Sequence, residues 1–117
     1  SHPKIAYVNY CGLPGDKYHA VAEKYLPNGS CGVVSFGVKG GREAAAAFMG
    51  HLKIAAIETH VADARTCCLH PASSTHRQMN DEQLIAAGVQ PDLVRMSCGL
   101  EDKNDLIHDI AQALDQI

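Results

Sequence analysis

The sequence predicts an α+β domain in which helices pack on one face of a four-stranded mixed or antiparallel sheet. Short apolar runs with strand-like residues alternate with segments whose apolar residues recur every three or four positions. Two of the runs follow one another with no helical pattern between them, which is unlike a regularly alternating parallel-sheet protein. The length of 117 residues suits one ordinary core. Residues 1–117 are therefore expected to form a single domain.

Four segments carry the strand pattern. Each is rich in β-branched or other apolar residues and is bounded by glycine or polar residues. These segments are residues 31–38, 54–57, 65–69 and 93–98. The small and polar stretch 58–64 joins the second and third strands, and the sequence leaves the order of the strands in the sheet open.

Two helices are expected in the first half of the chain. Asp16 is expected to cap a short helix that runs through Tyr25 and ends at the turn-forming residues 27–29 (PNG). Residues 42–52 place alanines, Phe48 and Leu52 along one apolar stripe, which favours a helix that covers a sheet face.

Two further helices are expected in the second half. Asn80 and Gln83 have the spacing of a capping box ahead of a helix that Gly88 closes. Asp102, with Asp105, is expected to cap the last helix, whose apolar residues up to the end of the chain lie on one broad face. The other face of that helix is charged and is expected to be solvated.

Composition and charge exclude several classes of function. Hydrophobic residues make up 46% and charged residues 20%, the balance of a folded, water-soluble domain. The net charge is −3 and no basic cluster is interleaved with aromatic residues, so no nucleic-acid partner is expected. No apolar stretch approaches the roughly 20 residues of a membrane span. The five cysteines are odd in number, and we expect a cytoplasmic protein without a disulfide framework.

Histidines and cysteines are dense between residues 60 and 76, which raises a zinc site as an alternative. Their spacing is unlike that of zinc sites, because neighbouring strand residues such as Cys67 and Cys68 point to opposite faces. Buried cysteines and turn-forming histidines are the favoured interpretation, and no metal site is predicted. Residues 71–76 (PASSTH) lack the strand–nucleophile–helix context of a serine hydrolase. They are expected to form a turn whose side chains bond the backbone.

Arg95 is the residue for which the sequence most clearly predicts an anionic partner. It lies inside the apolar run at residues 93–98, where a strand side chain is expected to be half-buried. Burial of a guanidinium is costly unless an anion accepts its planar donors. From the residues alone, an internal acid such as Glu101 or Asp102 and an anionic ligand remain equal alternatives.

Five segments together resemble the C-terminal domain of the Cys/Met-metabolism family of pyridoxal-phosphate enzymes, which have fold type I. The most specific are HPASSTH at residues 70–76 and RMSCGLED at 95–102. YCGL at residues 10–13, KYLPNG at 24–29 and SFGVKGG at 35–41 resemble the family in the same order and spacing. The resemblance covers the chain from about Val8 to its end. Within the family, VADART at residues 61–66 is similar to O-acetylhomoserine sulfhydrylases.

The resemblance implies roles for particular residues. Arg95 corresponds to the arginine that clamps the α-carboxylate of the amino-acid substrate, which moves the interpretation towards ligand binding. His60 stands where the family usually has serine or asparagine near that carboxylate, and it is retained as a second substrate-binding candidate. Positions that resemble supporting or scaffold residues of the site are Asp63, Ser73, Thr75 and His76. No catalytic residue is assigned.

The resemblance also implies a missing part. Family members bind pyridoxal phosphate through a lysine in a Ser/Thr-x-Thr-Lys setting, and no lysine here has that setting. We therefore expect a C-terminal substrate-binding domain without its upstream cofactor-binding domain, and no cofactor bound to this chain. The implied parent makes homocysteine or methionine from O-acetylhomoserine and is a homo-oligomer, a tetramer in full-length family members. A related cystathionine γ-synthase, cystathionine γ-lyase or methionine γ-lyase is one alternative, and an independent small-molecule-binding module is another.

Overall fold

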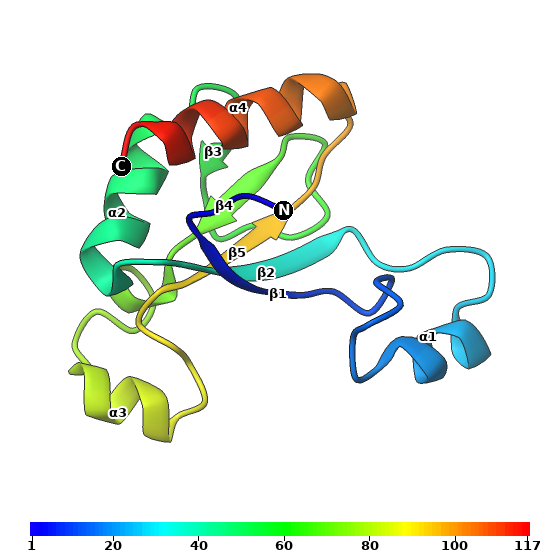
Figure 1. The fold of residues 1–117 in the computed structure, drawn as a ribbon, viewed down its shortest axis with the longest axis horizontal. Coiled ribbons are helices and arrows are strands. Elements are labelled where there is room, and N and C mark those ends of the chain that lie inside the picture. Colours follow the sequence, from blue (N-terminus) through cyan, green and yellow to red (C-terminus); the bar gives the residue numbers. More distant parts are fainter.

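The computed structural model describes residues 1–117 and contains one five-stranded mixed sheet (Figure 1). Its strands are β1 (Ile5–Asn9), β2 (Val33–Val38), β3 (Ala56–Ile57), β4 (Cys67–Leu69) and β5 (Leu93–Ser97). The order across the sheet is β1-β2-β5-β4-β3, and every neighbouring pair is antiparallel except β3 with β4. The predicted α+β class with a mixed sheet is confirmed, but the sheet has one strand more than the four predicted.

The additional strand is β1, which the sequence interpretation missed. It lies at the edge of the sheet, and its residues are partly or fully exposed. The Tyr7 ring of β1 lies over Gly37 of β2. A residue with a Cβ atom at position 37 would place that atom 2.3 Å from the ring, which is too close. Its hydroxyl donates to Asp92, and burial together with this carboxylate raises the pKa of Tyr7 to about 12. Gly37 thus leaves room for the aromatic ring that fixes the edge strand.

The helices are α1 (His19–Tyr25), α2 (Gly41–His51), α3 (Asp81–Ala86) and α4 (Lys103–Asp115), with a 3₁₀ turn, η1 (Pro71–Ser73). Helices α2 and α4 pack against each other and cover one face of the sheet, as predicted. Helices α1 and α3 instead lie at the periphery, away from the central strands (Figure 1). None of the helices has the length and apolar character needed to cross a membrane.

Two of the predicted helix caps are confirmed. The Asn80 side chain accepts from the backbone N–H of Gln83 while the Gln83 side chain accepts from the backbone N–H of Asn80, which completes the capping box of α3. Asp102 accepts from two backbone N–H groups in the first turn of α4. Both contacts satisfy donors that a helix start otherwise leaves unpaired.

The prediction that Asp16 caps the first helix is wrong. Helix α1 begins only at His19, and its N-terminus carries no side-chain cap. Asp16 accepts instead from the backbone N–H groups of Tyr10 and Tyr18. It therefore braces the turns that precede the helix, because a short aspartate side chain bonds nearby backbone donors in turns as readily as at helix ends.

The core lies between the sheet and the pair α2 and α4. Phe36 of β2 and Phe48 of α2 meet edge to face with ring centroids 5.7 Å apart. Burial raises the pKa of Cys68 to about 12, so this thiol behaves as a small apolar side chain. The buried cluster consists of Phe36, Val38, Ala45, Phe48, Met49, Ala55, Cys68, Val94, Met96, Ala113 and Leu114.

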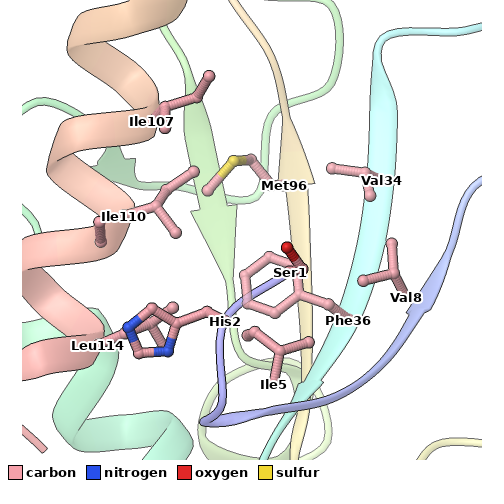
Figure 2. A pocket seen from close by; sticks show the side chains of 11 residues that line it. Ser1, His2, Ile5, Val8, Val34, Phe36, Met96, Ile107, Ile110 and Leu114 are labelled. Carbon is pink, nitrogen blue, oxygen red and sulfur yellow. The ribbon is translucent and has the colours of Figure 1, made fainter.

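One side of this layer is open. Figure 2 shows an apolar groove between α4 and strands β1 and β2, with a volume of about 320 Å³. Val8 and Ile107, on opposite sides of the groove, are 44% and 63% exposed. The apolar side chains that line the groove include Ile5, Val8, Val34, Phe36, Met96, Ile107, Ile110 and Leu114. Exposed apolar surface of this kind favours association with another apolar surface.

A buried carboxylate joins α4 to the segment that follows α2. Asp109 is 3% exposed, and its oxygens accept from the backbone N–H groups of Lys53, Ile54 and Ala55 at 2.8, 2.8 and 3.1 Å. Burial opposes ionisation of this group, but these donors and Gln112 hold its pKa below the usual range. The predicted charged face of α4 is therefore not fully solvated, since Asp109 turns inward as a structural anchor.

The return loop, residues 58–66, connects the parallel strands β3 and β4. It contains Ala62 with a φ of 60°, the one non-glycine residue in the left-handed region. The backbone N–H of Ala62 donates to the Ser97 hydroxyl of β5 at 3.1 Å. An alanine is disfavoured in this conformation, so contacts such as this one must impose it.

Replacing Asp109 with asparagine should lower the free energy of unfolding by about 1–3 kcal/mol, because an amide cannot accept from all the buried donors that the carboxylate satisfies. Since the folded-state pKa is lowered, the stabilisation by Asp109 is full above the unfolded value of about 4 and is lost as the pH falls through the folded value. Asp109→Asn should thus flatten the acid side of the stability curve. Denaturant unfolding at several pH values measures both effects.

Asp115→Asn is the matched control on the same helix, because the side chain of Asp115 is 70% exposed. A surface substitution of this kind should change stability by less than about 0.5 kcal/mol. Equal losses in the two variants would contradict the anchoring role of Asp109.

Ala62→Gly should raise the free energy of unfolding by about 0.5–1 kcal/mol, because glycine adopts the left-handed conformation without the Cβ penalty. Ala64→Gly is the control, since Ala64 has a negative φ and glycine there only adds freedom to the unfolded chain. Thermal unfolding of both variants measures the difference. A destabilised Ala62→Gly protein would show that the alanine methyl makes a contact that outweighs the strain.

Candidate carboxylate-binding site

Arg95 lies in the central strand of the sheet. β5 pairs on one side with β2 and on the other with β4, so that Arg95 stands opposite Ser35 and Leu69. Its neighbours Val94 and Met96 are buried in the core beneath α2 and α4. Because successive strand residues point to opposite faces, the side chain of Arg95 emerges on the face that these helices leave uncovered. The residue is half-buried, as predicted.

The guanidinium of Arg95 makes one hydrogen bond, in which Nη2 donates to the backbone carbonyl of Thr59 in the return loop at 2.8 Å. The internal ion pair considered from the sequence is not formed. Both carboxylate oxygens of Glu101 accept from Thr66, and Asp102 caps α4. The other donors of the Arg95 fork therefore face outward without a protein acceptor, in the arrangement that suits a planar anion.

His60 follows Thr59 in the return loop, so the structure brings its backbone close to the carbonyl that holds Arg95. The His60 side chain is 59% exposed, and its Nε2 lies 3.7 Å from a carboxylate oxygen of Glu58. It makes no hydrogen bond to the guanidinium. The two sequence-predicted binding residues thus share a region, but only Arg95 is held in a defined orientation.

A local ion pair engages Asp63, one of the predicted supporting residues. Asp63 accepts from the backbone N–H of Arg65 at 2.8 Å and from its Nε at 3.4 Å. These hydrogen bonds hold the pKa of Asp63 below its usual range and raise the pKa of Arg65. The charge of Asp63 is therefore balanced within the loop and does not compete with a ligand for Arg95.

The other predicted supporting residues form the turn after β4. His70 is buried, with Nδ1 2.8 Å from the Ser73 hydroxyl and Nε2 2.7 Å from the carbonyl of Pro91. The Thr75 hydroxyl lies 2.8 Å from Nδ1 of His76. The predicted turn is confirmed, since the hydroxyls of Ser73 and Ser74 donate to the backbone carbonyl of His70. The His76 imidazole, which was expected to bond the backbone, bonds the Thr75 hydroxyl instead, and none of these side chains bonds to Arg95.

The histidines and cysteines considered for a metal site do not come together, since no group of three or more His, Cys, Asp or Glu side chains has a metal-binding arrangement. The residues near Arg95 also do not fit pyridoxal phosphate, because no lysine lies in β5 or in the return loop. Lys4 bonds the last carbonyl of the chain, while Lys17 lies over the Tyr18 ring before α1 and Lys24 over the Tyr25 ring at the end of α1. The arrangement can therefore bind and orient an anion but offers no covalent attachment.

The sequence interpretation missed three contributors to the site. Thr59 acts through its carbonyl, which leaves no signal in the sequence. Ser97 and Thr66 bond to partners on other elements, and such pairings appear only once the sheet order is known. Glu101 had a signal, an acid shortly after the last strand, but from the sequence it was considered only as one of two alternative acid partners for Arg95 and not as a partner of Thr66.

The chain is similar to known proteins over almost its whole length. The family model described as Cys/Met metabolism PLP-dependent enzyme matches residues 1–115. O-acetyl-L-homoserine sulfhydrylase 1 of Thermus thermophilus is 45% identical over 112 residues, which are 96% of this chain and 27% of that protein. Homocysteine synthase of Schizosaccharomyces pombe is 45% identical over 97% of this chain and 27% of its own length.

A solved structure shows the same fold. The putative O-acetylhomoserine (thiol)-lyase of Campylobacter jejuni superposes with a TM-score of 0.87 and 36% identity, over 98% of this chain and 27% of that one. That crystal structure contains N'-pyridoxyl-lysine-5'-monophosphate. The chain thus spans about a quarter of the length of these relatives. By the match over nearly all its residues, it belongs to the Cys/Met metabolism family of PLP-dependent enzymes.

Proposed function

We propose that this chain is the C-terminal, carboxylate-recognising domain of an O-acetylhomoserine sulfhydrylase. The observation that carries the proposal is the outward fork of Arg95 on the central strand, held at one nitrogen by the Thr59 carbonyl and free at the others. An amino-acid substrate presents a carboxylate that a guanidinium binds with two parallel hydrogen bonds. The similarity to sulfhydrylases over almost the whole chain supports the choice of substrate.

In the full-length enzyme, the role of this chain is to bind and orient. Arg95 grips the α-carboxylate, and the return loop borders it on the side of Thr59 and His60. Pyridoxal phosphate, held by residues outside this chain, supplies the electron sink for the reaction. The overall change replaces acetate on O-acetylhomoserine with sulfide or methanethiol, which gives homocysteine or methionine. We further propose that the full-length enzyme is a cytoplasmic homo-oligomer.

A γ-lyase is the second candidate. L-methionine gamma-lyase of Fusobacterium nucleatum is 39% identical over 99% of this chain, and an arginine grip on the α-carboxylate serves either reaction. Assays of the full-length protein with O-acetylhomoserine plus sulfide, and with methionine alone, separate the two. An independent binding module, the candidate from another class, would be favoured if the parent gene encoded no upstream Ser/Thr-x-Thr-Lys segment.

Arg95→Lys and Arg95→Ala in the full-length enzyme should each lower kcat/KM for O-acetylhomoserine roughly ten- to a hundred-fold. Lysine keeps the charge but loses the two-pronged donor geometry, and hydrogen bonds to a charged partner contribute about 1.5–3 kcal/mol. Cofactor uptake and thermal stability should be retained, because Arg95 makes no internal ion pair. Steady-state kinetics and thermal melts of both variants provide the measurement.

The internal-support alternative makes the opposite prediction for the same variants. If Arg95 serves mainly to hold the return loop through Thr59, Arg95→Lys should be destabilised while substrate kinetics remain normal. Unchanged kcat/KM in a destabilised Arg95→Lys enzyme would refute the carboxylate grip.

The 117-residue chain alone should self-associate through the groove between α4 and the strands β1 and β2, since exposed apolar surface favours association. Ile107→Glu should shift it towards monomer, because Ile107 lies at the groove and a charge there must be desolvated on contact. Ile85→Glu on α3 is the control, at a residue that is 53% exposed but outside the groove. Light scattering that shows a monomeric parent chain at high concentration would contradict this prediction.

A further inference from the structure

The return loop is fastened to the end of β5 by Glu101, a residue to which the proposed function gives no role. Oε1 of Glu101 accepts from the backbone N–H of Thr66 and Oε2 accepts from the Thr66 hydroxyl, both at 2.7 Å. The same hydroxyl accepts from the backbone N–H of Gly99 at 2.9 Å. Thr66 has no exposed surface, so all three hydrogen bonds are shielded from water at that side chain. One carboxylate and one hydroxyl thus join the loop to the chain that leaves β5.

The backbones of the loop and of the segment after β5 are in close contact at this point. A Cβ atom on Gly99 would lie 2.4 Å from the carbonyl oxygen of Ala64 and 2.5 Å from the nitrogen of Thr66. The backbone N–H of Leu100 donates to that same Ala64 carbonyl at 2.8 Å. Only glycine permits this approach, so the position of the loop is set by direct contact with β5 and its continuation.

Three hydrogen-bonded contacts hold the return loop, in order from its end at β4 towards Arg95. Glu101 holds Thr66, the Ser97 hydroxyl holds the backbone of Ala62, and the carbonyl of Thr59 accepts from Arg95. Ala62 between them is held in a left-handed conformation, which an alanine keeps only when its surroundings impose it. Loss of the contacts between Glu101 and Thr66 removes one of the attachments that hold this strained loop, and we expect the Thr59 carbonyl to shift as a result.

The ionised form of Glu101 makes these contacts. The hydrogen bonds from Thr66 hold the pKa of Glu101 below its usual range. At neutral pH the carboxylate is therefore an acceptor at both oxygens, which the two donors of Thr66 require.

We propose that Glu101 is a positioning residue of the carboxylate-binding site, which acts through Thr66 and the return loop to fix the Thr59 carbonyl that orients the Arg95 guanidinium. The inference rests on the proposed role of Arg95. Glu101 itself does not contact the substrate. It keeps the Arg95 guanidinium in its binding orientation before the substrate binds. Binding then does not lose the conformational entropy of ordering the arginine side chain.

The test uses Thr66→Val and Glu101→Ala in the full-length enzyme. Valine keeps the shape of threonine but removes the hydroxyl, so Thr66→Val loses the hydrogen bonds to Oε2 of Glu101 and from Gly99 and keeps the backbone N–H bond to Oε1, whereas Glu101→Ala loses both bonds to the carboxylate. We expect KM for O-acetylhomoserine to rise roughly three- to tenfold with kcat changed less than about twofold, because a misplaced binding group weakens ground state and transition state alike. Thr66→Ser restores the hydroxyl and should recover most of the lost affinity.

Asp102→Ala is the matched control, because Asp102 is the neighbouring acid and caps α4 without touching the loop. It should lower the melting temperature and leave KM unchanged, so a rise in KM in the loop variants cannot be ascribed to lost stability. Normal KM in Thr66→Val and Glu101→Ala, in an enzyme whose KM does rise with Arg95→Ala, would overturn the positioning role. Normal kinetics in Arg95→Ala would instead overturn the proposed function itself.

Discussion

The central position of β5 is the constraint on which the rest of the structure depends. This strand pairs with β2 and β4, so its backbone is fixed on both sides, and Val94 and Met96 anchor it from below in the core. Because successive strand residues point to opposite faces, the side chain of Arg95 lies on the face opposite to those two residues. A charged side chain at the middle of a sheet is held more rigidly than the same side chain on a loop, which suits a residue that must meet an anion in one orientation.

The same strand organises the return loop. Ser97 lies two residues beyond Arg95 on the same face, and Glu101 follows after the strand ends, so the loop is tied to the continuation of the strand that carries the arginine. The site is therefore built from one strand and one loop packed along it. The role that we propose for it is limited to recognition: Arg95 is the group that can bind an anion, Thr59 and Glu101 only position it, and none of the three attacks carbon or binds a cofactor covalently.

The sequence predicted those features whose signals are local. The capping box at Asn80, the Asp102 cap and the half-buried Arg95 each depend on a few adjacent residues, and all three are confirmed. The Asp16 cap is a local prediction that failed, because Asp16 bonds backbone donors of the neighbouring turns instead. The other failures depend on distant partners. β1 is an exposed edge strand whose sequence pattern is weak. Asp109 lies in sequence among the charged residues of α4, and only the tertiary structure brings the backbone after α2 over its carboxylate.

A crystal structure of the full-length protein with a bound α-amino acid would test the central claim most directly. It should show the ligand carboxylate within hydrogen-bond distance of two nitrogens of the Arg95 guanidinium, with Nη2 still donating to the carbonyl of Thr59. A carboxylate bound elsewhere, with Arg95 paired to an acidic side chain from another part of the protein, would contradict the assignment of this domain as the carboxylate-recognising part of the enzyme.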